Sequence, residues 1–206
     1  MVGRGLIDIT HDQSLLVSET RVAIEVGVTR WFGASLVLPF RLVSTEITYL
    51  DTDGREVQLV RDGLHHRDET VSGLGDPMLL GAISGARGGW RWTARAGLTL
   101  PLGRTEEDPF TLGDQGLAHQ HLQMGNGTVN PVLAGEVSRA WGPWRLGGFA
   151  FTQQVVYANG LGYQAGDRYA GGASLSRRLG AWTARGGVEV QAETAERWGG
   201  VVHTDD

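Results

Sequence analysis

The 206-residue sequence predicts an all-β protein, namely an antiparallel up-and-down transmembrane β-barrel of about ten strands. Three observations support this prediction. The chain has 32 glycines and only 6 prolines, without the three-residue period of collagen. Apolar and polar residues alternate with a period of two, and short connections alternate with long ones. Because this length suits one domain, we expect a single β-barrel domain over residues 1–206.

Three segments alternate most clearly, and each runs to ten residues or more. Strands of soluble proteins usually have about 5–6 residues, whereas a tilted strand needs about 9–11 residues to cross a bilayer. The segment length therefore favours membrane strands. The apolar faces of the three segments are formed by Val22, Ile24, Val26 and Val28; by Trp90, Trp92, Ala94, Ala96, Leu98, Leu100 and Leu102; and by Trp182, Ala184, Gly186, Val188, Val190 and Ala192.

The connections differ in length in a regular way. Short ones cover residues 30–33, 85–89, 140–143 and 179–181, and long ones cover residues 44–72, 103–128 and 157–167. Outer-membrane barrels have short turns at one end and long loops at the other. This asymmetry therefore predicts a barrel in the outer membrane of a bacterium of Gram-negative type.

Six of the seven tryptophans lie in or beside the short turns. Indole has an apolar ring and a polar N–H, so tryptophans gather where hydrocarbon meets lipid headgroups. We therefore expect a girdle at one membrane interface, formed by Trp31, Trp90, Trp92, Trp141, Trp144 and Trp182.

A soluble β-barrel that binds an apolar ligand in its interior is the alternative, since soluble all-β chains also alternate. The two structures differ in which face of the strands is turned outward. A membrane barrel requires Leu98, Val188 and Val190 to face lipid and Arg95 and Glu189 to face inward.

Charge and composition exclude several classes of protein. The net charge of −5 argues against nucleic acid as a partner, because phosphate neutralisation needs an excess of basic residues. The absence of cysteine excludes disulfides, thiolate metal sites and cysteine nucleophiles. No Gly-x-Ser-x-Gly motif is present, so we do not expect an enzyme.

Ten strands is the simplest even count, with eight from the four hairpins and two partial strands at residues 1–9 and 198–203. The N-terminus has no basic segment followed by an apolar run of signal-peptide length. We therefore expect a chain trimmed at both ends.

Three glycine- and proline-containing motifs resemble a known family. They are Gly73-Leu-Gly-Asp-Pro77, Leu100-Pro-Leu-Gly103 and Gly125-Asn-Gly-Thr-Val-Asn-Pro131. Together they resemble the transporter-like outer-membrane β-barrel proteins of the phenol-degradation (MetA-pathway) family, over residues 18–193. The resemblance implies an outer-membrane barrel that passes small, often hydrophobic solutes.

These motif residues also have expected local roles. Pro77 and Pro131 suit only the beginning of a strand, where no ladder N–H is required. The glycines are expected to supply positive φ where a long loop narrows into a strand, at Gly73, Gly75, Gly125 and Gly127.

Four histidines in the long loops form a candidate metal site, namely His65, His66, His119 and His121. In an extended segment His119 and His121 point the same way, which supplies half of a zinc, copper or nickel site. The simpler interpretation is that these are solvated loop residues or that they hold the third loop against the barrel.

Charged residues on the expected inner face are candidates for the lumen. Because a barrel of this size is narrow, we expect these mixed charges to form a paired network that fills the interior rather than an open aqueous pore. They are Glu25, Arg41, Arg91, Arg95, Glu136, Arg185 and Glu189.

The sequence thus predicts a non-enzymatic outer-membrane barrel without a cofactor, which lies in a lipid bilayer and passes small, hydrophobic or aromatic solutes by passive diffusion. Two alternatives stay open, the soluble barrel with an apolar ligand and an outer-membrane barrel that captures metal through its loop histidines.

Overall fold

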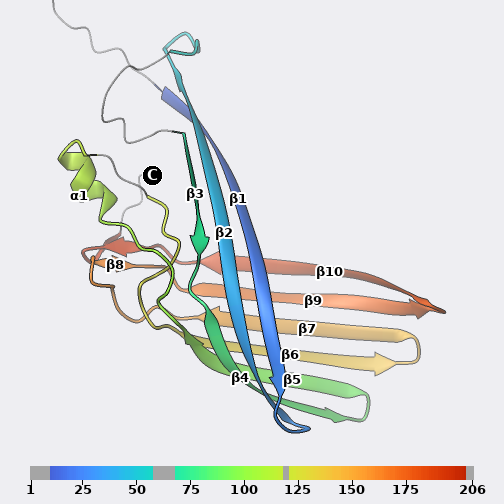
Figure 1. Ribbon diagram of the computed structural model, residues 1–206. Coiled ribbons are helices and arrows are strands. Elements are labelled where there is room, and N and C mark those ends of the chain that lie inside the picture. Colours follow the sequence, from blue (N-terminus) through green and yellow to red (C-terminus); the bar gives the residue numbers. More distant parts are fainter. Residues whose placement is uncertain (1–9, 58–67, 118–120, 203–206) are drawn as a thin grey trace, which may run out of the picture.

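An antiparallel sheet that curls into a half-barrel of about ten strands dominates the computed structural model (Figure 1). The structure describes residues 10–57, 68–117 and 121–202. The elements are β1 (Thr10–Gly27), β2 (Phe32–Leu50), β3 (Glu69–Leu74), β4 (Met78–Arg87), β5 (Trp90–Thr99), α1 (Pro109–Asp114), β6 (Pro131–Trp141), β7 (Trp144–Gln153), β8 (Tyr163–Gln164), β9 (Arg168–Leu179), β10 (Trp182–Glu193), β11 (Arg197–Trp198) and β12 (Val201–Val202). The prediction of an all-β antiparallel fold is confirmed.

Four hairpins follow one another along the main sheet, in the order β1-β2-β4-β5-β6-β7-β9-β10, and β3 pairs with β2 beside this path. All four hairpin turns lie at the same edge of the sheet, which we call the turn edge (Figure 1). Tight two-residue turns favour positive φ, and glycine adopts it without steric cost. Gly88, Gly89, Gly142 and Gly180 have φ of 57°, 81°, 53° and 64°. These glycines explain three of the four predicted short turns, and the β1–β2 turn, residues 28–31, has no positive φ.

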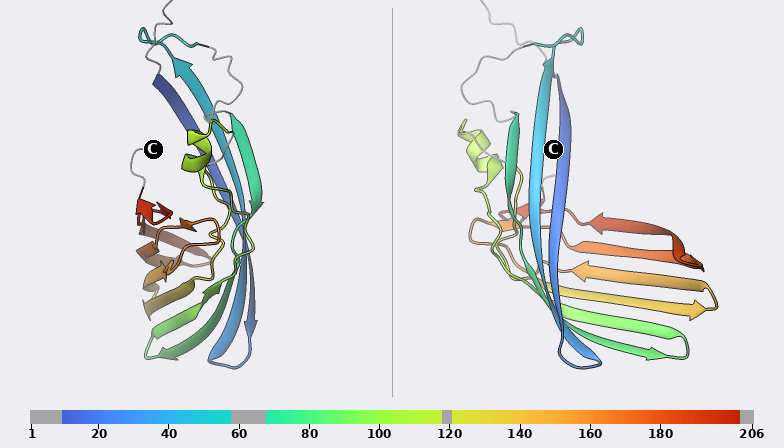
Figure 2. Two further views of the ribbon diagram at one scale, coloured as in Figure 1. Left: turned by 90° about the vertical axis from the view of Figure 1, so that its left-hand side faces the viewer. Right: turned by 45° about the vertical axis from the view of Figure 1, so that its right-hand side comes forward.

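The first hairpin is much longer than the other three, since β1 and β2 have 18 and 19 residues. Its register pairs Thr10 with Leu50 and Gly27 with Gly33. Figure 2 shows this hairpin rising beyond the rest of the sheet. Pairing with β4 covers the part of β2 near the turn edge, and pairing with β3 covers the part farther from it. The predicted loop 44–72 therefore contains the end of β2 and the beginning of β3.

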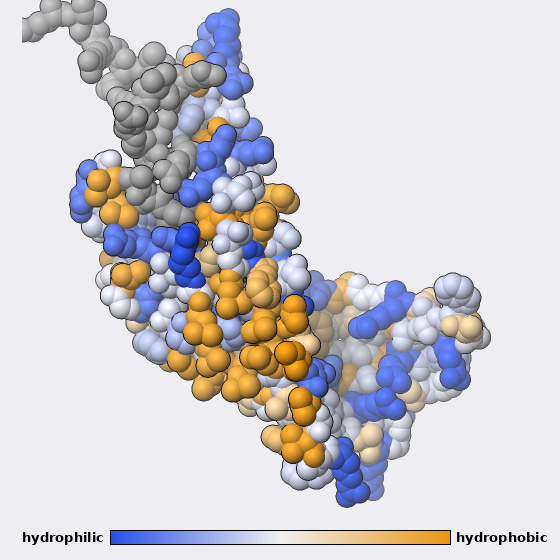
Figure 3. Space-filling model, viewed as in Figure 1, coloured by the Kyte–Doolittle hydropathy of each residue, from blue (hydrophilic) through white to orange (hydrophobic). Residues whose placement is uncertain are grey.

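Side chains that point away from the half-barrel are mostly apolar and exposed. Leu98, Val188 and Val190 are 46%, 74% and 72% exposed. Figure 3 shows a broad apolar area on the outside of β1 and β2, with hydrophilic surface toward the far end of this hairpin. Further exposed apolar residues on this convex face are Val22, Ile24, Val26, Leu79, Ile83, Leu133, Val137, Leu146 and Leu175. The apolar residues predicted to share one face of β1, β5 and β10 thus lie outward. The predicted strand from Trp90 ends at Thr99, so Leu100 and Leu102 lie in the connection that follows it.

The expected last strand at residues 198–203 is wrong. Its described part forms β11 and β12, which pair with each other and with β8 in a separate three-stranded sheet. Trp198 is only 3% exposed, and its ring lies 4.8 Å from that of Tyr163. Burial of this indole beside Tyr163 stabilises the small sheet. This sheet lies at the edge opposite the turn edge, which we call the long-loop edge, so residues 197–202 do not extend the main sheet. The other expected partial strand, at residues 1–9, lies outside the described residues.

The motif prolines begin or immediately precede strands, as predicted: Pro131 begins β6, and Pro77 precedes β4. The expected positive φ is correct for Gly127, at 68°, and wrong for the other three motif glycines. Two of these are required by close approach instead. A Cβ at Gly75 would lie 3.1 Å from Pro39 Cγ, and one at Gly125 would lie 2.6 Å from Gly103 Cα.

The only α-helix of the described residues is α1, whose N-cap is Asp108. The Asp108 carboxylate accepts hydrogen bonds from the backbone N–H groups of Phe110 and Thr111, at 3.0 and 3.4 Å. Among the described residues, no helix combines the length and the apolar character needed to cross a membrane.

Candidate functional site

The concave face of the half-barrel carries most of the polar chemistry. All seven charged residues that the sequence analysis assigned to the inner face line hollows on this side of the sheet, namely Glu25, Arg41, Arg91, Arg95, Glu136, Arg185 and Glu189. Strand alternation explains their common placement, because residues two apart along a strand lie on the same face.

Arg95 is the centre of the first ion-pair group. Its guanidinium lies 3.0 Å from the Glu136 carboxylate on the neighbouring strand β6 and 4.0 Å from that of Glu25 on β1. Because β1 and β5 are not adjacent in the sheet, the Glu25 contact crosses the concave surface. This group is the paired network that the sequence predicts, at three of its seven residues.

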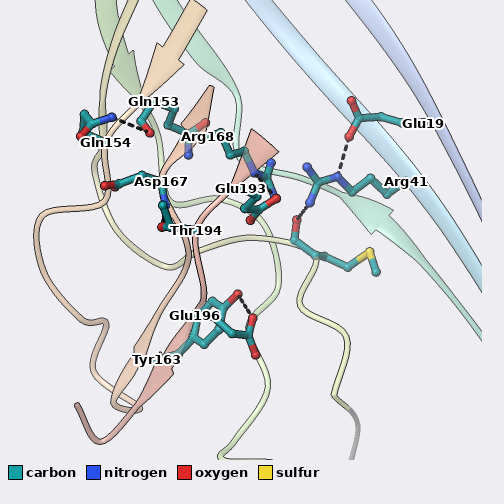
Figure 4. Close-up of polar contacts among 11 residues, drawn as sticks. Glu19, Arg41, Gln153, Gln154, Tyr163, Asp167, Arg168, Glu193, Thr194 and Glu196 are labelled. Atoms are coloured by element: carbon teal, nitrogen blue, oxygen red, sulfur yellow. Dashed lines mark hydrogen bonds and ion pairs between the residues drawn. The ribbon is translucent and has the colours of Figure 1, made fainter. Parts of the chain in front are cut away.

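Arg41 is the centre of a second group. The sequence-based prediction places Arg41 on the inner face but does not include Glu19 and Arg21. The Arg41 guanidinium lies 2.6 Å from the Glu19 carboxylate and donates a hydrogen bond of 3.3 Å to the Met124 carbonyl (Figure 4). Glu19 also accepts a hydrogen bond from Arg21. Glu19 and Arg21 share the odd-numbered face of β1 with Glu25, so extending the alternation N-terminally would have identified them.

A hollow of about 1090 Å³ lies between the β1–β2 hairpin and strands β7, β9 and β10. Arg41 and Arg168 contribute positive charge to its wall, and Glu193 lies 3.2 Å from Arg168 (Figure 4). The same wall also has apolar members, which are Val17, Val43, Met78, Leu122, Met124, Phe149 and Phe151. An interior with apolar surface and a few charged groups suits small organic molecules.

The three motifs of the resemblance meet at the long-loop edge of the sheet. The Asp76 carboxylate accepts a hydrogen bond of 2.9 Å from the Gly103 N–H and one of 2.6 Å from the Asn126 N–H. The Asn159 side chain donates to the Asn126 carbonyl at 3.1 Å. We call the group Asp76, Gly103, Gly125 and Asn126 the Asp76 junction. It joins the short β3–β4 connection to both ends of the long β5–β6 connection, beside the Arg41 group.

Burial raises the pKa of the Asp76 carboxyl above its ordinary value of 3.8, against the opposite effect of its two backbone hydrogen bonds and of Arg41 and Arg168. A raised pKa in the folded state means that folding favours the protonated acid. The contribution of protonated Asp76 to the free energy of unfolding is therefore complete below the pKa that this carboxyl has in the unfolded chain. It is lost as the pH rises through the pKa of the folded state.

We expect the free energy of unfolding of the wild type to fall relative to that of Asp76→Asn as the pH rises from 3 to 7, because the amide does not titrate. Chemical unfolding at a series of pH values measures this difference. A difference in free energy of unfolding that is independent of pH, or one that grows in favour of the wild type as the pH rises, would contradict the raised pKa of Asp76.

The long-loop edge carries a second cluster, formed by Val155, Tyr163, Ala165 and Trp198 with Phe110 against it. The Tyr163 hydroxyl donates a hydrogen bond of 2.9 Å to Glu196 (Figure 4). Burial, together with the nearby Glu196 carboxylate, raises the pKa of Tyr163. The hydroxyl therefore stays protonated as a donor, and it links β8 to the residue that precedes β11.

Three members of the candidate metal site, His65, His66 and His119, lie outside the described residues. His121 is half-buried, and its ring meets the Phe110 ring edge-on at 5.6 Å. Within the described ranges, no group of three or more histidine, aspartate or glutamate side chains is placed to bind a metal ion. The metal site stays a prediction.

The six candidate girdle tryptophans lie at or beside the turn edge, because each is in a hairpin turn or near the strand end next to one. They are Trp31, Trp90, Trp92, Trp141, Trp144 and Trp182. Trp182 is the most exposed, at 80%. The indole of Trp92 covers Gly85 on the neighbouring strand, where a Cβ would lie 2.6 Å from the ring. A glycine opposite Trp92 thus gives the ring a flat surface on which to pack.

Neither a protein-family model nor a curated protein sequence matches this chain.

Proposed function

We propose that the protein is an outer-membrane β-barrel that lets small, hydrophobic or aromatic solutes pass without catalysis. One observation carries the proposal, namely the orientation of the strands, with apolar side chains on the convex face and charged side chains on the concave face. This orientation suits a lipid environment outside and a polar interior. The resemblance of the three motifs to phenol-degradation transporters points to the same function.

The exposed apolar surface argues against the soluble alternative. Soluble monomers rarely expose contiguous apolar patches larger than a few hundred Å². Here, exposed leucine, isoleucine and valine side chains recur on the convex side of strands β1, β4, β6 and β10. A soluble barrel with an apolar ligand would need the opposite orientation, with these side chains around the ligand.

The ion pairs of the concave face favour organic solutes over ions. Glu19 neutralises Arg41, and the carboxylates of Glu25 and Glu136 flank Arg95. Paired charges leave little field for attracting ions of one sign. We therefore propose a passage with small or no ion conductance, in which aromatic solutes contact Phe149 and Phe151.

Transport by proteoliposomes tests the proposal. Uptake of a small neutral aromatic solute, such as 4-hydroxybenzamide, is expected to be faster than into protein-free vesicles. The double variant Phe149→Ala/Phe151→Ala is expected to slow the uptake severalfold, because both rings line the hollow. The matched control Phe32→Ala/Phe40→Ala removes two rings at exposed positions and is expected to leave the uptake unchanged.

Two results would contradict the proposal. One is uptake that equals that of protein-free vesicles. The other is a wild-type chain that stays monodisperse without detergent at unchanged β content, which would favour the soluble barrel.

A further inference from the structure

Charge is distributed unevenly between the two edges of the sheet. The four hairpin turns and the adjoining parts of their strands, residues 26–34, 83–94, 137–147 and 175–188, contain no aspartate and no glutamate. The same segments contain eight of the 18 arginines, which are Arg30, Arg87, Arg91, Arg139, Arg145, Arg177, Arg178 and Arg185. The turn edge is therefore strongly positive in a chain whose net charge is −5.

Three of these arginines lie on the convex face among the girdle tryptophans. Arg87 and Arg139 occupy the strands on either side of Trp90 and pair in register with it. Arg177 pairs in register with Trp144. The register places all three on the tryptophan face, and all three side chains are exposed.

The tryptophans orient two of these guanidinium groups. Arg139 lies over the Trp90 ring at 5.2 Å from its centroid, and Arg177 lies over the Trp144 ring at 5.0 Å. Stacking occupies the face of a guanidinium and leaves its in-plane N–H donors available. Within the part of the chain that the structure describes, no ion pair or side-chain hydrogen bond joins Arg87, Arg139 or Arg177 to another residue.

An apolar depression of about 830 Å³ lies next to this row of arginines. Exposed Phe32, Ile83, Leu133 and Tyr169 line it together with small residues such as Ala94. Ala94 is four residues from Trp90 on the same face of β5, which corresponds to about 13 Å along a strand. A phosphate at the arginines and an acyl chain in the depression would thus lie within the length of one lipid.

We infer that Arg87, Arg139 and Arg177 form a binding surface for the phosphate of anionic phospholipids in the leaflet that surrounds the turn edge. Guanidinium groups bind phosphate through two parallel hydrogen bonds, and the adjacent indoles hold the arginines at headgroup depth. The carboxylate-free edge fits an anionic headgroup better than a neutral one. This inference rests on the proposed location in a membrane.

Quenching of tryptophan fluorescence by brominated lipids tests the inference, because six tryptophans lie at the turn edge. The full chain is reconstituted into phosphatidylcholine vesicles that contain either brominated phosphatidylglycerol or brominated phosphatidylcholine. We expect the wild type to associate with phosphatidylglycerol about three- to tenfold more strongly, since each arginine near an anionic surface contributes a favourable interaction.

The triple variant Arg87→Gln/Arg139→Gln/Arg177→Gln is expected to lose this preference, with a ratio of about one. Its matched control, Arg91→Gln/Arg145→Gln/Arg185→Gln, removes the same charge from residues that line the concave face, and it is expected to keep the preference. Equal quenching of both variants by brominated phosphatidylcholine shows that both are inserted.

The outcomes separate this inference from the proposed function. Quenching by both lipids without a preference in the wild type would overturn the lipid inference while supporting a membrane location. Loss of the preference in both triple variants would also overturn it, because diffuse charge would then explain the result. Absence of quenching by either lipid would contradict the membrane location itself.

Discussion

Replacing Ile83 by arginine is expected to destabilise the protein in a lipid bilayer by about 2–4 kcal/mol, the usual cost of an arginine on the lipid face near the bilayer midplane. Ile83 lies within β4 on the convex face and is 45% exposed. An arginine there would take its charge into hydrocarbon, where no carboxylate of the neighbouring strands faces it. Its register partners are Ala94 on β5 and Phe32 on β2.

The adjacent residue supplies the matched control. Ser84 points to the concave face, where its hydroxyl lies 3.0 Å from that of Thr93. Ser84→Arg introduces the same side chain at nearly the same depth, but into a polar hollow that already contains Arg95 and Glu25. We expect a much smaller effect on stability.

Refolding from urea into phosphatidylcholine vesicles, followed by tryptophan fluorescence, measures the free energy of unfolding of both variants in a bilayer. A soluble barrel would reverse the expectation, because its convex face would meet water and Ile83→Arg would then change little. Equal stability of the two variants would therefore refute the lipid-facing orientation.

Much of the main sheet could be predicted because its signals are local. The alternating segment that begins at Trp90 is β5, and the one that begins at Trp182 is β10. Glycines with positive φ close three of the four hairpins, and glycine-rich turns between alternating segments are visible in the sequence. The charged residues of the inner face follow from the same alternation, which explains why all seven line the concave side.

The remaining features depend on contacts between distant parts of the chain. Periodicity did not reveal that β2 continues to Leu50, because its far half is stabilised by pairing with β1 and β3. The small sheet forms because Trp198 packs on Tyr163, which is 35 residues earlier in the numbering. Likewise, Arg41 donates a hydrogen bond to the carbonyl of Met124, which is 83 residues later in the chain. No local pattern encodes such pairs.

The Asp76 junction yields the second large effect. Gly103→Ala is expected to lower the free energy of unfolding by about 1–3 kcal/mol, the usual cost of inserting atoms into a tightly packed site. A Cβ at Gly103 would lie 2.6 Å from the Gly125 Cα, 2.8 Å from the Gly125 N and 3.0 Å from the Asp76 carboxylate. Two of these contacts are with backbone atoms, so the strain can be relieved only by moving a long connection.

Movement of that connection would also weaken the hydrogen bond from the Gly103 N–H to Asp76. Gly160→Ala is the matched control, because a Cβ at Gly160 meets no atom within 4 Å and its φ is not positive. We expect urea unfolding of Gly160→Ala to match that of the wild type. Equal stability of Gly103→Ala would show that the three motifs are loosely packed, and the Asp76 junction would then have no structural role.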